Sequence, residues 1–287
     1  MFMKKLIERL LIFFIGLPAV VVLVLFLPYL HNLAMNIVSI LLSAIGAVEF
    51  SSMLEKMNIR ISKIESFLFG ALAPLAITLN ISLSLPDWIV PVLIMSGAGW
   101  ALLSGIFTRN TEIDAVINKV IGGFALLIYP GFFMFWVIKM NLWGNNFAIL
   151  LFLIIIIASD SLAWLFGTLF GEKNRGIIAV SPNKSIAGFI GGILGSIIVS
   201  ICTVFIFPGI FYDAPESALL LRAIILGFFT GIAGIAGDLA ESAIKRSCDF
   251  KDSGNLMLGR GGILDSIDSI VVAAPVFYML YKLLIIV

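Results

Sequence analysis

The chain has 287 residues, of which 61% are hydrophobic and 12% are charged, and its formal net charge is +1. This composition excludes a soluble enzyme, and the long continuous apolar runs exclude a membrane β-barrel, whose strands are short and alternate in polarity. We therefore predict an all-α polytopic integral membrane protein without a separate soluble domain.

Nine apolar segments follow one another along the chain, and each is expected to form a transmembrane helix. Their approximate ranges are 10–28, 31–50, 66–83, 88–107, 119–139, 145–170, 186–207, 219–241 and 263–285. The charged N-terminus followed by an apolar run is similar to a signal peptide, but the run is long and no small-residue cleavage site follows it. We expect this first segment to be retained as a span.

Basic residues are distributed unevenly among the polar segments. If the N-terminus is cytoplasmic, 15 of the 18 basic residues lie on the cytoplasmic side, and only Lys139, Arg222 and Lys282 lie outside. Cytoplasmic loops carry an excess of Lys and Arg, so we predict this orientation. The longest polar segments then all face the cytoplasm: 51–65, 108–118, 171–185 and 242–262. Any chemistry is expected at the cytoplasmic membrane surface.

The two halves of the chain differ in the polar groups that they place in apolar surroundings. Residues 1–140 carry few charges within spans and are predicted to be a multi-span scaffold. Residues 141–287 carry nearly all such groups and are predicted to be the catalytic region. The one histidine, His31, is expected at an outer turn, and Cys202 and Cys248 far apart. Neither a histidine-based site nor a disulfide is predicted.

Six acidic residues lie in or at the edges of predicted spans, where a carboxylate is costly and suggests a function. They are Glu49, Asp160, Asp238, Glu241, Asp265 and Asp268. A spacing of three places Asp238 with Glu241, and Asp265 with Asp268, on one helical face. Clustered carboxylates need a positive charge between them, and Mg²⁺ prefers oxygen ligands that include substrate phosphates.

We therefore predict a metal site at Asp238, Asp265 and Asp268, with Asp160 and Glu241 as further candidate ligands. Asp160 is expected to be better buried than most of the other acids. The alternative is that the acids pair with nearby cations and merely hold helix ends. Glu49, alone at the end of its span, is expected near the surface in a structural role.

Basic residues flank these acids in the segment before the ninth span. Lys245, Arg246 and Lys251 are spaced to contact several phosphates. Gly261 and Gly262 open the ninth span and would let a ligand approach the backbone closely. Positive-inside topology alone explains why the lysines are cytoplasmic, but it does not explain why they flank acids.

A second cationic segment, Ser181-Pro182-Asn183-Lys184-Ser185, precedes the seventh span. Ser185 can cap that helix, whose first N–H groups favour an anion, and Lys184 is a candidate phosphate ligand. In the sixth span, Gly167 and Gly171 follow Asp160 at helical spacing and are expected to allow close helix packing.

The run Ser242-x-x-Lys245-Arg246-x4-Lys251-Asp252, followed by Gly261-Gly262-x-x-Asp265-x-x-Asp268, resembles the C-terminal signature of the CDP-diacylglycerol synthases (phosphatidate cytidylyltransferases). Asp160-Ser161-x-Ala163-Trp164-x-x-Gly167-x-x-x-Gly171 and the 181–185 segment with Gly188 resemble two further motifs of that family. The resemblance covers about residues 155–270. The chain departs from the family at Arg260, where histidine is usual, at Ser266 and at Asn183.

The resemblance implies that the protein converts CTP and phosphatidate to CDP-diacylglycerol and pyrophosphate. It implies membrane lipids but no nucleic acid as partners, and a site facing the cytoplasm at a bacterial inner or cell membrane. On this basis we assign catalytic roles to Asp265, Asp268, Asp238 and Lys245. We assign phosphate binding to Lys184, Ser181, Ser185, Ser242, Arg246, Lys251, Arg260, Gly261 and Gly262.

The family is associated with Mg²⁺ and with K⁺ as a second cation, Mn²⁺ could replace Mg²⁺, and a homodimer is compatible with the resemblance. Two other functions remain open. A CTP-dependent polyprenol kinase would share the nucleotide but release CDP. A cation-coupled transporter would also use acids within the membrane, but such proteins bind their substrates near the midplane and often have repeated halves.

Overall fold

The computed structural model describes residues 16–106, 113–211, 218–257 and 261–286. Within these ranges the chain is helical, and its only β-structure is two isolated bridges, Arg175 with Ser185 and Met257 with Gly261. Seven helices of the described chain are long and apolar enough to cross a membrane, and one shorter apolar helix joins them. The predicted class, an all-α polytopic membrane protein, is confirmed.

The seven long helices coincide with seven of the nine predicted spans. The other two predicted spans contain shorter helices. Within 88–107, helix α5 (Ile89–Ser104) has 16 residues. Within 10–28, the described part contains α2 (Leu17–Phe26), which has 10 residues.

The chain divides into two compact units, which we describe separately. The first comprises Met1–Gly144 with Lys245–Ile267, and the second comprises Asn145–Ile244 with Asp268–Val287. The helices wholly within the first unit are α2, α3 (Tyr29–Lys56), α4 (Lys63–Ser82), α5, α6 (Ile113–Leu126), the π-helix η2 (Leu127–Phe132), α7 (Phe133–Lys139) and the 3₁₀-helix η3 (Met140–Trp143).

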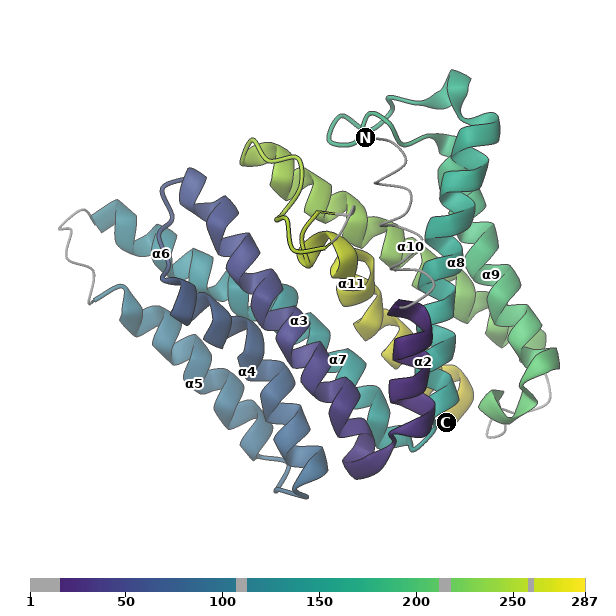
Figure 1. Ribbon diagram of the computed structural model, residues 1–287, viewed down its shortest axis with the longest axis horizontal. Helices are drawn as coiled ribbons and strands as arrows, with labels where there is room; N and C mark the ends of the chain where they lie inside the picture. Colours follow the sequence, from purple (N-terminus) through teal and green to yellow (C-terminus); the bar gives the residue numbers. More distant parts are fainter. Residues whose placement is uncertain (1–15, 107–112, 212–217, 258–260, 287) are drawn as a thin grey trace. The chain divides into compact units, whose positions relative to one another are not determined.

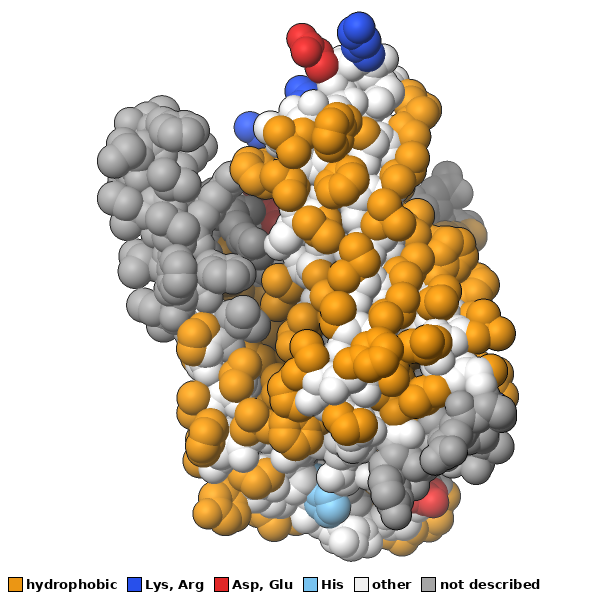
Figure 2. Space-filling model, turned by 90° about the vertical axis from the view of Figure 1, so that its right-hand side faces the viewer, with side chains coloured by type: hydrophobic (Ala, Val, Ile, Leu, Met, Phe, Trp, Pro, Cys, Tyr) orange, Lys and Arg blue, Asp and Glu red, His pale blue; other side chains and the backbone are white. Residues whose placement is uncertain are grey.

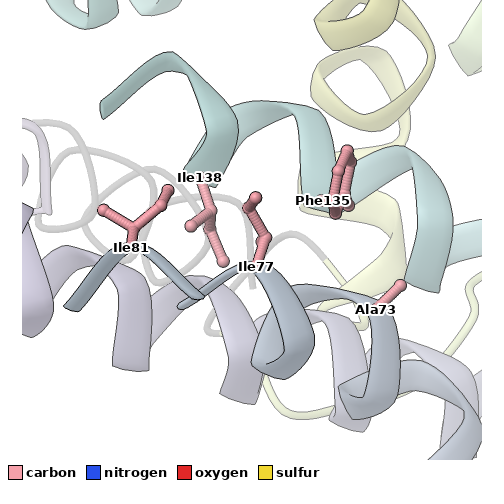
Figure 3. Packing of buried hydrophobic residues seen from close by; sticks show 5 residues of the cluster. All are labelled: Ala73, Ile77, Ile81, Phe135 and Ile138. Carbon is pink, nitrogen blue, oxygen red and sulfur yellow. The ribbon is translucent and has the colours of Figure 1, made fainter. Parts of the chain in front are cut away.

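Helices α3, α4 and α7 of the first unit pack side by side (Figure 1). The capping box of Ser62 and Glu65 satisfies the first N–H groups of α4. Farther along, α4 and α7 face each other through a cluster of buried apolar side chains (Figure 3), namely Ala73, Ile77, Ile81, Phe135 and Ile138. Burying a side chain of Leu or Ile size contributes about 1.5–3 kcal/mol in water. In a bilayer the close packing itself holds the helices together.

The second unit contains the long helices that carry most of the predicted site. They are α8 (Asn146–Phe170), α9 (Ile186–Ile206), most of α10 (Leu219–Ser247) and most of α11 (Leu264–Tyr281). Three short helices accompany them: η4 (Glu172–Asn174), η5 (Pro208–Phe211) and η6 (Lys282–Ile286).

Helix α9 has two faces that explain its position. Gly191, Gly192 and Gly195 face α8 so closely that an added Cβ would touch its backbone oxygens. Small residues on one face let membrane helices approach each other. A different face exposes apolar side chains such as Ile190, which is about half exposed. Figure 2 shows hydrophobic side chains covering this side of the molecule, as expected for contact with lipid.

Candidate active site

A cavity of about 410 Å³ opens within the second unit. Its walls come from the C-terminal half of α8, the 175–185 loop, the first turns of α9 and the C-terminal half of α10. The side chains that matter chemically are Asp160, Arg175, Lys184, Ser185 and Asp238. The volume falls in the range of small-molecule sites, and both signs of charge are present in its wall.

Local folding brings the 181–185 segment to this cavity. Ser185 caps α9, and its Oγ accepts a hydrogen bond from the Gly188 N–H at 3.0 Å, as predicted. The neighbouring Lys184 Nζ lies 2.6 Å from Asp238 Oδ2, and both side chains are partly exposed. A Cβ added to Gly167 of α8 would lie 3.3 Å from Ser185 Oγ and 3.7 Å from Gly188 Cα, so small residues let the two helices meet at the cavity.

Four acidic side chains interact within the second unit. The carboxyl group of Asp268 interacts electrostatically with those of Asp238, Glu241 and Asp160. Asp268 is 8% exposed and Glu241 is fully buried. Asp160 is exposed and lines the cavity, so the expectation that it is better buried than most of the other acids was wrong. Hydropathy identifies a helix as a span, but it does not show which of its faces lines a cavity.

The donor chemistry of this acidic group suits a hard divalent cation. Carboxylate oxygens are the ligands that Mg²⁺ prefers, and Mg²⁺ usually takes only one or two of them together with substrate phosphates. In the part of the chain that the structure describes, no three acidic, histidine or cysteine side chains converge on a ready-made metal site. The side chains of this acidic group thus match such a cation in donor type.

The polar loop before α11 belongs to the first unit, where Lys245 forms an ion pair with Asp265. The other carboxylate oxygen of Asp265 accepts hydrogen bonds from the backbone N–H groups of Ser253 and Gly262, each at 2.8 Å. One oxygen of Asp265 is thus engaged by the loop, while the other faces a lysine. In the folded chain Asp265 therefore pairs with a nearby cation, as the alternative interpretation of the acids expects.

The other predicted phosphate ligands are more open. Arg246 and Lys251 are exposed, and Arg246 Nη1 donates to the Phe250 carbonyl oxygen at 3.4 Å. Ser181 and Ser242 are partly exposed. Gly261 has φ +101°, which favours glycine, whereas Gly262 is buried. Arg260 lies outside the described residues.

One residue of the cavity was not predicted, and one acid was predicted at the wrong place. Arg175 lines the cavity, with its Nη2 3.1 Å from the Gly167 carbonyl oxygen, and its position between two motifs was the available signal.

Glu49 is only 7% exposed and accepts hydrogen bonds from Ser253, Ile263 and Leu264. The expectation that Glu49 lies near the surface was wrong. A carboxylate in an apolar run was the signal, and its partners, more than 200 residues away, could not be seen locally.

Comparison with known proteins gives consistent results. The model of the cytidylyltransferase family matches residues 7–284. A phosphatidate cytidylyltransferase of Staphylococcus haemolyticus is 32% identical over 273 residues, which cover 92% of this chain and 96% of that protein. One of Chlamydia pneumoniae is 30% identical over 87% of this chain and 83% of its own length. One of Aquifex aeolicus is 32% identical over 57% of this chain and 58% of its own length.

Proposed function

The chain belongs to the cytidylyltransferase family, and from this we propose that it is a phosphatidate cytidylyltransferase. In the proposed reaction an oxygen of the phosphatidate phosphate forms a bond to the α-phosphorus of CTP. The bond from that phosphorus to the bridging oxygen breaks, and pyrophosphate leaves. The products are CDP-diacylglycerol and pyrophosphate.

The observation that carries the proposal is the cavity that joins cationic and acidic side chains within membrane helices. Lys184 and Arg175 offer donors to phosphate oxygens, and Arg can bind two of them at once. Asp160 and Asp238 stand in the same wall. Apolar side chains such as Trp164 and Phe189 also line the cavity, which suits a substrate whose tails remain in lipid.

The acidic group of the second unit is the proposed metal site. Asp238 and Asp268 would hold Mg²⁺, with Asp160 and Glu241 as further candidate ligands. Asp265 is proposed as a ligand from the sequence motif alone. When bound, Mg²⁺ neutralises phosphate charge and orients the attacking and leaving oxygens. Lys184, which faces Asp238 here, would exchange this partner for a phosphate when CTP enters.

The second cationic group supports the same chemistry. Lys245 is held against Asp265, and Arg246 and Lys251 are exposed in the following loop. We propose that they bind phosphate oxygens of the two substrates. A phosphate monoester is already a nucleophile, so its attack needs no strong general base. The Asp265 carboxylate, fixed by the loop on one side, keeps Lys245 oriented.

We propose that the N-terminus and the polar loops face the cytoplasm, where CTP is available. The distribution of basic residues supports this orientation. The enzyme would then act at the cytoplasmic surface of a bacterial inner or cell membrane. K⁺ as a second cation is proposed from the family alone.

The competing function, a CTP-dependent polyprenol kinase, transfers a different phosphoryl group. Purified protein incubated with phosphatidate and CTP labelled at the α-phosphorus should produce labelled lipid and unlabelled pyrophosphate. CTP labelled at the γ-phosphorus should give labelled pyrophosphate and no labelled lipid. A kinase would give the opposite pattern with a polyprenol, releasing CDP.

A further inference from the structure

Glu49 of α3 lies against the start of α11 inside the first unit. Its Oε1 accepts a hydrogen bond from the Ile263 N–H at 3.0 Å, and its Oε2 accepts one from the Leu264 N–H at 2.9 Å. The Leu264 N–H belongs to the first turn of α11 and the Ile263 N–H directly precedes it, at the positive end of the helix, which favours a carboxylate. Glu49 therefore caps α11 from another helix, more than 200 residues away.

The same carboxylate reaches Asp265 through one hydroxyl group. Ser253 Oγ lies 3.0 Å from Glu49 Oε2 and 3.0 Å from Asp265 Oδ2. It also accepts a hydrogen bond from the Asp265 N–H at 3.2 Å. A hydroxyl has a single proton, so it bridges the two acids by donating to one of them at a time. The position of Ser253 thus depends on Glu49, and the position of Asp265 depends on Ser253.

Packing around Glu49 leaves the loop little freedom. A Cβ added to Gly254 or to Gly262 would collide with the Glu49 carboxylate, and at Gly262 it would also collide with Ser253 Oγ. Glycine at both positions lets the backbone close over a buried acid. The loop is therefore shaped around this carboxylate as well as bonded to it.

We infer that Glu49 is a positioning residue for the nucleotidyl transfer, acting through Ser253 to fix the carboxylate of Asp265 and its partner Lys245. The inference rests on the proposed function. It assigns the buried acid of the N-terminal region a part in catalysis without contact with substrate. Glu49→Gln keeps the shape of the side chain. It replaces one carboxylate oxygen with an N–H₂ group, which cannot accept a hydrogen bond from the backbone and hydroxyl donors that face it.

The test is steady-state kinetics of the purified full-length protein with CTP and phosphatidate. For Glu49→Gln we expect kcat to fall about 10- to 100-fold, as for a small displacement of a reacting group. KM for CTP should change less than about threefold, because the cavity with Lys184 stays intact. Glu65→Gln is the matched control, since Glu65 also caps a helix, α4, but is exposed and should leave kcat unchanged.

A double-mutant cycle separates positioning from general stability. If Glu49 acts through Ser253, then Glu49→Gln combined with Ser253→Ala should lose little more kcat than the worse single variant. Fully multiplicative losses would overturn the relay. If Glu49→Gln does not fold, the Ser253→Ala variant is used as the test. A reduced kcat at an unchanged melting temperature supports the inference, and a wild-type kcat overturns it.

The wild type measured in parallel distinguishes the two proposals. An inactive, folded wild type contradicts the proposed function and removes the inference with it. An active wild type, together with a Glu49→Gln variant whose kcat per folded molecule is unchanged, contradicts only the positioning role.

Discussion

Lys184 Nζ lies 2.6 Å from Asp238 Oδ2, although 54 positions separate the two residues in the sequence. The lysine comes from the loop before α9 and the aspartate from α10, and both line the same cavity. Each was predicted to bind a different ligand, phosphate for the lysine and metal for the aspartate. In the folded chain each neutralises the other, and CTP with its metal would replace both partners.

This pair leads to the first prediction. In Lys184→Ala we expect KM for CTP to rise about tenfold or more, because a hydrogen bond to a charged group contributes about 1.5–3 kcal/mol. Steady-state kinetics measure the change. Lys173→Ala is the control, because Lys173 lies exposed in the same loop but does not line the cavity. An unchanged KM in Lys184→Ala would show that the lysine does not bind the nucleotide.

In the acidic group of the second unit, neutralising one acid should raise the melting temperature of the metal-free protein but lower its activity. Asp268 is buried and lies beside three other acids, so its ionised form is unfavourable when no metal is bound. In EDTA, Asp268→Asn should therefore melt above the wild type, by about 2–4 °C for each kcal/mol of this cost removed. Added Mg²⁺ should stabilise the wild type more than the variant. Thermal unfolding in detergent measures both effects, and a variant that melts lower in EDTA would contradict the explanation.

Close packing of α10 against α11 yields a third prediction. A Cβ at Gly237 would collide with the Asp268 carbonyl oxygen and lie 3.0 Å from the Val272 Cβ. Gly237→Ala should destabilise the protein by about 1–3 kcal/mol through overpacking and lower kcat by displacing Asp268. Gly99→Ala is the control, since its added Cβ meets no atom within 4 Å. Equal melting temperatures for both variants would exclude this tight contact.

The proposed orientation can be tested by cysteine labelling in a background that lacks Cys202 and Cys248. Lys173→Cys should react with a membrane-impermeant thiol reagent only after spheroplasts are permeabilised. Gly209→Cys, in the η5 segment between the seventh and eighth predicted spans, which is predicted to be outside, should react in intact spheroplasts. The opposite pattern would reverse the topology and place the cavity on the wrong side for CTP.

Much of the fold could be predicted because membrane spans are encoded locally. A continuous apolar run defines a helix without knowledge of its neighbours, and seven runs coincide with long helices. The cap at Ser185 was equally local, since it depends on a residue three positions away. The acids could be recognised as a candidate site because a carboxylate is costly in hydrocarbon.

The pairing of charges could not be predicted, because it depends on contacts between distant segments. The positive-inside rule assigns Lys184 and Lys245 to one side of the membrane but does not say which acid each one faces. The partners of Glu49 could not be predicted for the same reason. Its cost in an apolar run was visible, whereas the loop that offsets this cost lies more than 200 residues away.

The central claim is that the acids at the start of α11 serve nucleotidyl transfer. Transfer of label from α-labelled CTP into phosphatidate tests it most directly, using purified wild type, Asp265→Asn and Asp268→Asn in parallel with Mg²⁺. We predict robust labelling by the wild type and a fall of about 100-fold or more in each variant, since misplaced or missing reacting-site groups cost that much. Near-normal labelling by both variants would contradict the account.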